Sequence, residues 1–292
     1  MRPSYGQSSF GQRTSVGEAI KVLEPRTPPR PLVASIPHGS TVIPERFKSL
    51  LTVDPDRLWV DAFTPELYSF LGDLGAVTVQ AALSRFVADP NRDPDYMLFG
   101  PFWSAIVPSL TPIGKTIYSA EPSREELAER VAMAHTAYHQ AIDQAIERLG
   151  QRYRSLLLLD LHSFGHASDQ FDADVILGDG RGTTAAPAVI DLVEASLSEQ
   201  GFSVVRNVVF SGGWIVRRFA DAAHVDAVQI ELNQRSYIDD GDIEADRFPR
   251  SFDPQRVDAV SDRLRPAISR ILKSYEGEIG GAQGAPARSR LS

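Results

Sequence analysis

The sequence of 292 residues contains no cysteine. This absence excludes disulfide bonds, thiolate nucleophiles and thiolate metal sites. Any bound metal must therefore be held by His, Asp, Glu and water, a ligand set that suits a catalytic zinc or a similar divalent ion.

An excess of positive charge is also absent. The 38 acidic residues outnumber the 30 Lys and Arg residues, which gives a formal net charge of -8. Binding to nucleic-acid phosphates requires a concentrated basic face, and no basic run here is longer than two residues. We therefore expect no nucleic-acid partner.

Long apolar runs are missing too. No stretch approaches the roughly 20 apolar residues that a membrane span requires. Residues 1–14 are rich in Ser, Gly, Gln and Arg and lack the apolar centre of a secretory signal. We expect a cytoplasmic protein without a membrane partner, and a hydrophobic content of 42% is typical of soluble globular chains.

The two ends differ in composition from the middle. Residues 1–28 end in a proline cluster and predict a flexible N-terminal segment, whereas residues 277–292 are rich in Gly, Ala and Ser and predict a disordered tail. Residues 29–276 contain no linker, repeat or low-complexity stretch. They predict one α/β domain that carries the functional site.

Short apolar runs alternate with amphipathic stretches along this domain. Strands are predicted at 32–36, 76–81, 155–161, 173–177, 203–208 and 227–232. Helices are predicted at 56–74, 123–149, 186–200, 214–222 and 254–275. Ser123 with Glu126 forms a capping-box pattern, and Gly150 is suited to ending that helix. The alternation predicts a parallel or mixed sheet covered by helices on both faces.

Three polar residues lie at the ends of predicted strands, where α/β folds build their sites. His38 follows the first core strand, His162 ends the central strand after four leucines, and Glu231 interrupts the apolar last strand. These groups can bind a metal ion or transfer a proton. Taken singly, the histidines also fit turn or structural positions, and Glu231 also fits a solvent-facing edge. Asp160 shares a strand face with His162 and is placed to orient its imidazole.

Charged and amide side chains gather in residues 84–92, which contain two arginines, an aspartate and an asparagine. Guanidinium groups bind carboxylates through paired hydrogen bonds, so this segment indicates recognition of an acidic substrate. A salt-bridged surface loop is the alternative. Arg217 and Arg235 are further carboxylate-binding candidates, although an arginine in such a position, judged singly, is more often a solvated charge.

Taken in order, these segments resemble the N-formylglutamate amidohydrolase family over about residues 31–240. The matching pieces are Pro37-His38-Gly39-Ser40, Asp61 with Pro65-Glu66-Leu67-Tyr68, Ser84-Arg85 through Asp89-Pro90-Asn91-Arg92, Asp160-Leu161-His162-Ser163, 174–178, 207–213, and Gln229-Ile230-Glu231-Leu232 with Arg235 and Tyr237. The family is related to zinc carboxypeptidases and aspartoacylase-like enzymes. The resemblance implies a three-layer α/β/α sandwich around a central mixed, mostly parallel sheet.

The resemblance also implies one divalent metal ion, with His38 and His162 among its ligands. The related carboxypeptidases take a further ligand from a glutamate three residues after the first histidine, where this sequence has Thr41. Asp61 matches the aspartate of the family's own motif and is the expected third ligand, with Glu45 as the alternative. Zinc is the expected metal, and cobalt, manganese and iron also suit these ligands.

The remaining matches concern the substrate and the reaction. Glu231 would be the general base, and Arg85 would help to stabilise the oxyanion. Asn91 and Arg92 match a pair that grips a substrate carboxylate in the relatives. Further substrate-binding candidates are Arg217, Arg235 and Tyr237.

These features predict a metal-dependent amidohydrolase that cleaves the formyl or small acyl amide of an N-acylated acidic amino acid. The alternatives are a carboxypeptidase- or aspartoacylase-like hydrolase of a larger amide, and a catalytically silent protein that binds a metal or anion. Asp226 stands where the family often has histidine, and we expect this difference to alter the pocket. The sequence leaves open the exact acyl group, the native metal and the oligomeric state.

Overall fold

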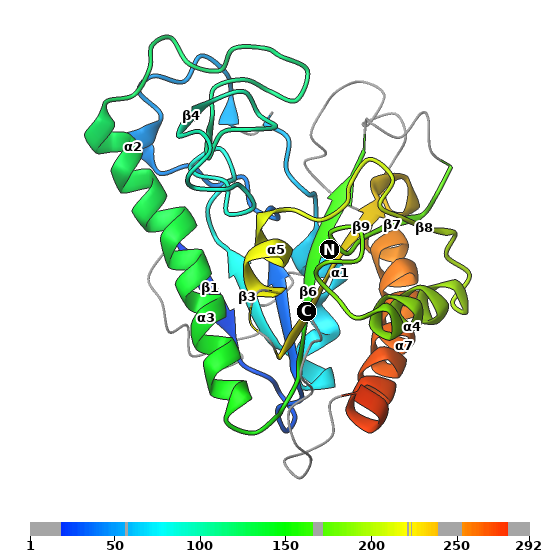
Figure 1. Ribbon diagram of the computed structural model, residues 1–292. Helices are drawn as coiled ribbons and strands as arrows, with labels where there is room; N and C mark the ends of the chain where they lie inside the picture. The colour runs from blue at the N-terminus through cyan, green and yellow to red at the C-terminus, as the bar shows by residue number, and fades with distance from the viewer. Residues whose placement is uncertain are drawn as a thin grey trace, which may run out of the picture.

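The computed structural model describes residues 19–55, 58–165, 172–220, 222, 224–238 and 253–279 (Figure 1). The strands of its main sheet are β1 (Ile20–Leu23), β2 (Leu32–Ile36), β3 (Val77–Ala81), β6 (Leu156–Phe164), β7 (Val175–Gly178), β8 (Val204–Arg206) and β9 (Val225–Asn233). They form one sheet in the order β1-β3-β2-β6-β9-β7-β8. Only the pairings β1–β3 and β7–β9 are antiparallel, so the predicted mixed, mostly parallel sheet is confirmed.

Helices cover both faces of this sheet. They are α1 (Thr64–Leu67), α2 (Arg124–Arg130), α3 (Ala137–Gly150), α4 (Pro187–Ser198), α5 (Trp214–Ala220) and α7 (Pro254–Ser274). Helices α1, α4 and α7 bury apolar side chains against one face, and α3 and α5 do so against the other. In Figure 1, α3 lies on one side of the strands and α4 and α7 lie on the opposite side. The predicted three-layer α/β/α architecture is therefore confirmed.

The leucine run of β6 supplies both cores. All nine residues of the strand are buried. Because successive side chains of a strand point to opposite faces, Leu157 and Leu159 join the core under α4 and α7, whereas Leu156 and Leu158 join the core under α3. The absence of an alternating polar pattern thus reflects burial on both faces.

A third apolar cluster lies away from the main sheet, beneath the loops that follow β2 and β3. It packs Phe47, Phe86, Phe102 and Tyr118 together, and it includes a short sheet of β4 (Phe99–Gly100) and β5 (Val107–Pro108). These loops stand at the top of Figure 1. They form one wall of a pocket, because the segment from Arg85 to Ile113 contributes several of the residues that line it.

The prediction of one helix over residues 56–74 is wrong for the described part of that range. Only α1 and a 3₁₀ helix, Ser69–Leu74, form there, and residues 56 and 57 lie outside the described residues. Phe63 has a left-handed φ of 57°, which interrupts any helix arriving from earlier residues. The residues before it are drawn instead toward β2, since Asp61 N donates to His38 O at 2.9 Å and Leu58 is buried in the third cluster.

The prediction for residues 123–149 is confirmed with one difference. The helix is continuous, but a π-helix (Val131–Thr136) separates α2 from α3. Ser123 Oγ accepts from Glu126 N at 3.2 Å, as expected of an N-cap. The Glu126 carboxylate binds Arg130, which is fully buried, so the second half of the capping box is replaced by an ion pair.

The predicted chain ends also differ from the structure. Ile20–Leu23 forms the edge strand β1 with buried Ile20 and Val22, so this part of the expected flexible segment belongs to the fold. After α7 a π-helical turn, Tyr275–Ile279, continues past the predicted boundary at residue 276. Residues 1–18 and 280–292 lie outside the described residues. Within the part that is described, no helix has both the length and the apolar character needed to cross a bilayer.

Candidate active site

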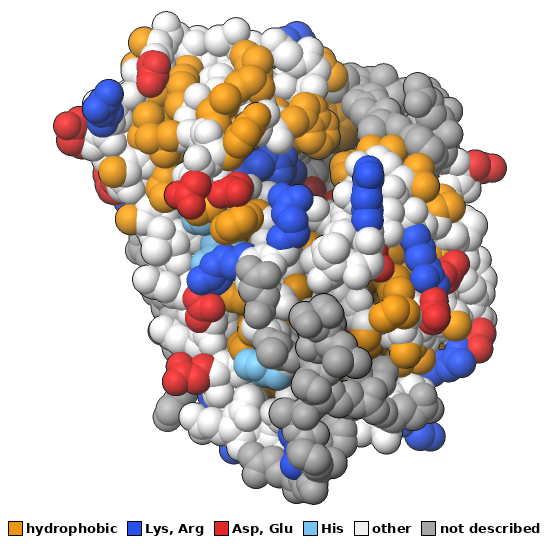
Figure 2. Space-filling model, viewed as in Figure 1, with side chains coloured by type: hydrophobic (Ala, Val, Ile, Leu, Met, Phe, Trp, Pro, Cys, Tyr) orange, Lys and Arg blue, Asp and Glu red, His pale blue; other side chains and the backbone are white. Residues whose placement is uncertain are grey.

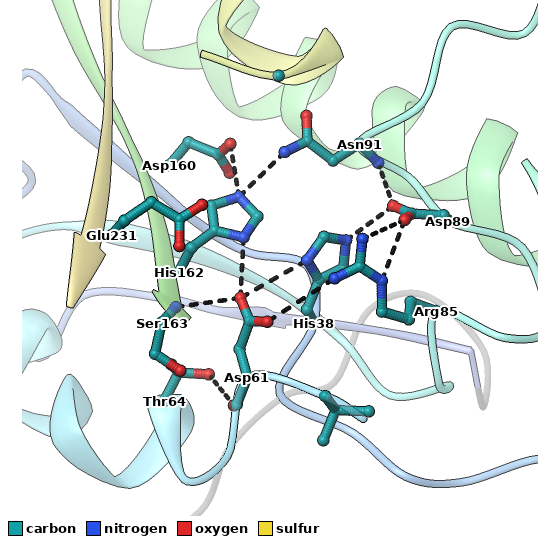
Figure 3. A network of polar contacts seen from close by, with 12 residues as sticks. His38, Asp61, Thr64, Arg85, Asp89, Asn91, Asp160, His162, Ser163 and Glu231 are labelled. Atoms are coloured by element: carbon teal, nitrogen blue, oxygen red, sulfur yellow. Dashed lines mark hydrogen bonds and ion pairs between the residues drawn. The ribbon is translucent and has the colours of Figure 1, made fainter. Parts of the chain in front are cut away.

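The three residues predicted to bind a metal converge at the carboxyl ends of β2 and β6. One ligand atom each from His38, Asp61 and His162 lies within 4.8 Å of the others, and all three residues are buried. Asp61 Oδ2 is 2.9 Å from His162 Nδ1 and 3.6 Å from His38 Nδ1 (Figure 3). The structure thus brings together side chains that are up to 124 positions apart, on a strand end, a loop and the central strand.

The loop carrying Asp61 is held by several contacts at once. Ser163 N donates to Asp61 Oδ2 at 3.2 Å, and Thr64 Oγ1 donates to the Asp61 carbonyl at 3.0 Å. Gly39 faces this loop so closely that an added Cβ would lie 2.6 Å from Pro65 Cδ. The absence of a side chain at Gly39 therefore allows the chain leaving β2 to pass directly against the start of α1.

Each imidazole is oriented by a buried carboxylate. His38 Nε2 lies 2.7 Å from Asp89 Oδ1, and His162 Nε2 lies 2.8 Å from Asp160 Oδ2. Because an ionised carboxylate only accepts hydrogen bonds, Nε2 of each ring donates and each Nδ1 faces Asp61. The amide of Asn91 lies beside His162 Nε2 at 3.2 Å, and its Oδ1 accepts from Ile215 N at 2.9 Å.

This donor set fits a divalent cation. His38 Nδ1 is buried and has no hydrogen-bond partner among the described residues. A buried polar atom without a partner costs free energy, and a cation between the three ligand atoms would remove that cost. Two imidazole nitrogens and one carboxylate are a typical three-residue zinc ligand set, which leaves a position for water or substrate.

The pKa shifts of Asp61 and His162 also fit a bound cation. Burial opposes ionisation of Asp61, but His38 and His162 outweigh it and lower the pKa of this carboxyl below its usual value. Burial likewise disfavours a charged His162, yet Asp160 and Asp61 raise the pKa of its imidazole well above the usual value. A cation bound at this position would take the place of the imidazole proton next to Asp61.

Glu231 lies next to this cluster, because it pairs in register with His162 across β6 and β9. Its side chain is buried, and Gln229 Nε2 donates to its Oε1 at 2.5 Å. Burial raises the pKa of Glu231 to about 7, with Asp61 adding to this effect and His162 opposing it. A carboxyl group with a pKa near neutrality is suited to act as a general base.

Three arginines line the same pocket. They differ in whether a carboxylate lies near the guanidinium group. Arg85 Nε and Nη2 donate to Asp89 Oδ2 at 3.1 and 2.5 Å, and Arg92 Nη2 lies 3.7 Å from the same oxygen. Arg217 is exposed, and its guanidinium has no acidic partner among the described residues. Arg217 is therefore free to bind an anion, whereas Arg85 is already paired.

The pocket has a volume of about 740 Å³ and is lined by most of the predicted site residues. They are His38, Asp61, Arg85, Asn91, Arg92, His162, Arg217 and Glu231. Neither Arg235 nor Tyr237 is among the lining residues. Tyr237 is buried and its hydroxyl donates to Ala62 O at 2.8 Å, so it supports the loop that carries Asp61 instead of facing a substrate.

The positions of Glu45 and Asp226 in the structure bear on two other expectations. The alternative ligand Glu45 is 89% exposed and pairs with Lys48, so it is not near the cluster. The expectation that Asp226 alters the pocket is wrong, because Asp226 does not line it. Asp226 lies at the opposite end of β9, where it accepts hydrogen bonds from Ala186 N at 2.8 Å and Tyr275 Oη at 3.0 Å.

Sequence reasoning missed several supporting residues. The sequence pattern placed Asp89 only in a charged segment, although its carboxylate orients His38. His135 and His139 had no predicted role, yet their Nε2 atoms donate to Arg92 O at 2.9 Å and Pro90 O at 2.8 Å. These two bonds hold the backbone on either side of Asn91. Their spacing of four residues on a predicted helix, which places both on one face, was the available signal.

Comparison with known proteins identifies a family and relatives that match most of the chain. The model of the N-formylglutamate amidohydrolase family matches residues 30–238. The N-formylglutamate deformylase of Pseudomonas aeruginosa is 34% identical over 252 residues, which cover 83% of this chain and 92% of that protein. The N-formylglutamate deformylase of Pseudomonas putida is 32% identical over 223 residues, covering 72% of this chain and 82% of that protein.

A solved structure is similar over most of the chain as well. The crystal structure of N-formylglutamate amidohydrolase from Ralstonia eutropha superposes with a TM-score of 0.71. Its sequence is 26% identical, and the match covers 88% of this chain and 98% of that one. The similarity therefore extends over most of the chain.

Proposed function

Because the chain belongs to the N-formylglutamate amidohydrolase family, we propose that it hydrolyses the formyl, or another small acyl, amide of an N-acylated acidic amino acid. The observation that carries this proposal is the buried His38–Asp61–His162 cluster next to the Glu231 carboxyl group, in a pocket lined by arginines. A nucleophile source, a base and anion-binding groups thus lie in one cavity.

In this proposal His38, Asp61 and His162 hold one divalent metal ion, with zinc preferred over cobalt, manganese and iron. When bound, such an ion polarises a carbonyl group and lowers the pKa of water to about 7. The carboxylates of Asp89 and Asp160 keep both imidazoles in the required orientation through their Nε2 atoms.

Glu231 is the general base. Its carboxylate removes a proton from the attacking water and then gives that proton to the nitrogen of the leaving amine. A pKa of about 7 allows both steps near neutral pH, since the group is neither a strong acid nor permanently protonated. Gln229 holds one carboxylate oxygen and leaves the other available for this proton transfer.

The arginines divide the remaining tasks. Arg85 lies over the ring of Phe102 and approaches Asp61 Oδ1 to 3.9 Å, so its position suits stabilisation of the negative charge that develops on the carbonyl oxygen. Arg92, with Asn91 beside it, and Arg217 bind the carboxylates of the substrate. An acidic amino acid offers two such carboxylates.

The deciding experiment combines metal analysis with an assay for formate release from N-formyl-L-glutamate. We expect about one zinc or similar ion per chain, lost in His38→Ala and in His162→Ala together with turnover. Glu45→Ala serves as the control and keeps both the metal and the activity, because this residue is exposed and remote. A wild-type protein that stays metal-free and inactive after metal addition would sink the proposal.

A further inference from the structure

Large apolar side chains gather at the mouth of the pocket. Among the described residues, six such side chains are strongly exposed, and four of these six line the pocket. The four are Tyr96, Trp103, Ile113 and Val209, and we call them the outer subsite. Figure 2 shows hydrophobic side chains gathered at the top of the molecule, immediately above a group of Lys and Arg side chains. Exposed apolar surface grouped in this way marks a binding site.

The outer subsite remains open to solvent in the structure. Its four side chains are 55% to 71% exposed, so they contribute little to the stability of the fold. By contrast, the catalytic groups at the base of the pocket are at most 6% exposed in His38, Asp61, His162 and Glu231. The pocket therefore has a polar, enclosed base and an apolar, open mouth.

Val209 provides a second, independent observation. Its φ is 61°, a left-handed value that is strongly unfavourable for a β-branched residue. Phe210 N donates to Val208 O at 2.6 Å, which makes Val209 the centre of a tight three-residue turn. Such backbone strain costs free energy and is found mainly at functional sites. Here the strained residue presents an apolar side chain to the mouth of the pocket.

The volume of the cavity also indicates a ligand that reaches the outer subsite. A volume of about 740 Å³ falls within the range of pockets that enclose drug-sized ligands, whereas a formylated acidic amino acid is much smaller. Such a small substrate fills the polar base, where the arginines and Glu231 lie, and leaves the outer subsite uncovered. A substrate that covers it must carry apolar surface in addition to its carboxylates.

We infer that this pocket takes an N-acyl acidic amino acid that also carries an apolar group of several carbons, which packs against Tyr96, Trp103, Ile113 and Val209. The inference rests on the proposed function, because that function places the scissile amide at the base. The apolar group belongs either to a longer acyl chain or to a residue joined to the carboxyl end of the acidic amino acid. Both sources present the same chemistry to the outer subsite.

The test compares three substrates with the zinc-loaded enzyme. They are N-formyl-L-glutamate, N-benzoyl-L-glutamate and N-formyl-L-glutamyl-L-phenylalanine. We expect one of the two apolar substrates to exceed N-formyl-L-glutamate in kcat/KM by about tenfold or more. Preference for the benzoyl compound identifies the acyl chain as the source, and preference for the dipeptide identifies the carboxyl end.

Variants of the outer subsite test whether its side chains cause the preference for an apolar substrate. Trp103→Ala removes an aromatic wall, and Val209→Gly removes the apolar side chain while glycine tolerates the left-handed backbone. Each should lower the ratio of the two kcat/KM values, apolar substrate over N-formyl-L-glutamate, by about tenfold. Val42→Ala is the matched control, because Val42 is 56% exposed but does not line the pocket. A ratio unchanged in both subsite variants overturns the inference.

Failure of this inference is distinguishable from failure of the proposed function. Turnover of N-formyl-L-glutamate without any gain from an apolar group leaves the function intact and rejects the outer subsite. If no amide is hydrolysed, the proposed function fails, and calorimetric titration with the same three compounds decides the inference. Binding of an apolar compound about tenfold tighter than that of N-formyl-L-glutamate, lost in Trp103→Ala, supports it, and equal affinities reject it.

Discussion

The replacement Asp89→Asn tests how the site is built. Asp89 is fully buried, and its two oxygens serve different partners. Oδ1 accepts from His38 Nε2 at 2.7 Å and from Asn91 N at 2.8 Å, whereas Oδ2 binds the guanidinium of Arg85 at 2.5 Å and lies 3.7 Å from Arg92. Burial opposes ionisation, but Arg85, Arg92 and His38 hold the pKa of Asp89 well below its usual value. One carboxylate thus connects His38 with the arginines of the pocket.

We expect Asp89→Asn to lower the free energy of unfolding of the metal-free protein by about 3–5 kcal/mol, because it removes the closest counter-charge of the buried Arg85. We also expect zinc affinity to fall by about 10–100-fold, since the carboxylate that orients His38 is lost. The amide keeps the volume of the side chain, so neither effect arises from a cavity.

Urea unfolding of the metal-free protein and zinc competition against a chromophoric chelator measure the two effects separately. Asp143→Asn is the matched control, because its side chain is 50% exposed and pairs with Arg218 at the surface. This change should cost no more than about 1 kcal/mol and leave zinc affinity unaltered. An Asp89→Asn protein as stable as the control, with wild-type zinc affinity, would refute the reasoning.

Three further changes test other parts of the site. Glu231→Gln should keep the bound metal and lower kcat by at least about 100-fold, measured by formate release with metal analysis; retained turnover would reject Glu231 as the base. Burial lowers the pKa of His139 to about 3, below the 6.5 of an unfolded histidine, so its contribution to stability is complete above pH 6.5 and declines as the pH falls. Between pH 8 and pH 5 the wild type should lose about 2 kcal/mol more than His139→Gln in urea unfolding, and an identical pH dependence would contradict this. Arg217→Ala should raise KM for N-formyl-L-glutamate about tenfold without a change in the unfolding midpoint, because this exposed guanidinium has no acidic partner among the described residues; an unchanged KM would remove it from substrate binding.

Much of the site could be predicted because its residues follow strands. His38 and His162 stand at strand ends, and Glu231 interrupts an apolar strand, so all three were recognisable from local pattern alone. Asp61 was different, because it lies in a loop whose own periodicity suggested a helix. Only its match to a family motif indicated a ligand, and the structure brings it to both histidines.

Other residues lacked any local signal. Tyr237 and Arg235 stand in a matching segment, yet the chain turns after β9 and Tyr237 enters the core beneath Asp61. Asp89 looks like a surface charge in the sequence, but it is buried between His38 and Arg85. The side on which a loop residue lies depends on what packs over the loop, and that information is not contained in neighbouring residues.

The sequence by itself determined most helices and strands of this protein and the chemistry available to it. The leucine run of β6 requires burial on both faces, and the absence of cysteine restricts metal binding to His and carboxylate ligands. The tertiary structure decided which of these side chains lie next to one another. Pairing of β6 with β9 sets Glu231 beside His162, and folding of the loops after β2 and β3 brings Asp61 and Asp89 to His38. The physical reason is the separation along the chain of the residues involved. The periodicity of a helix or strand depends on residues a few positions apart, whereas strand order, register and loop packing depend on contacts between distant segments.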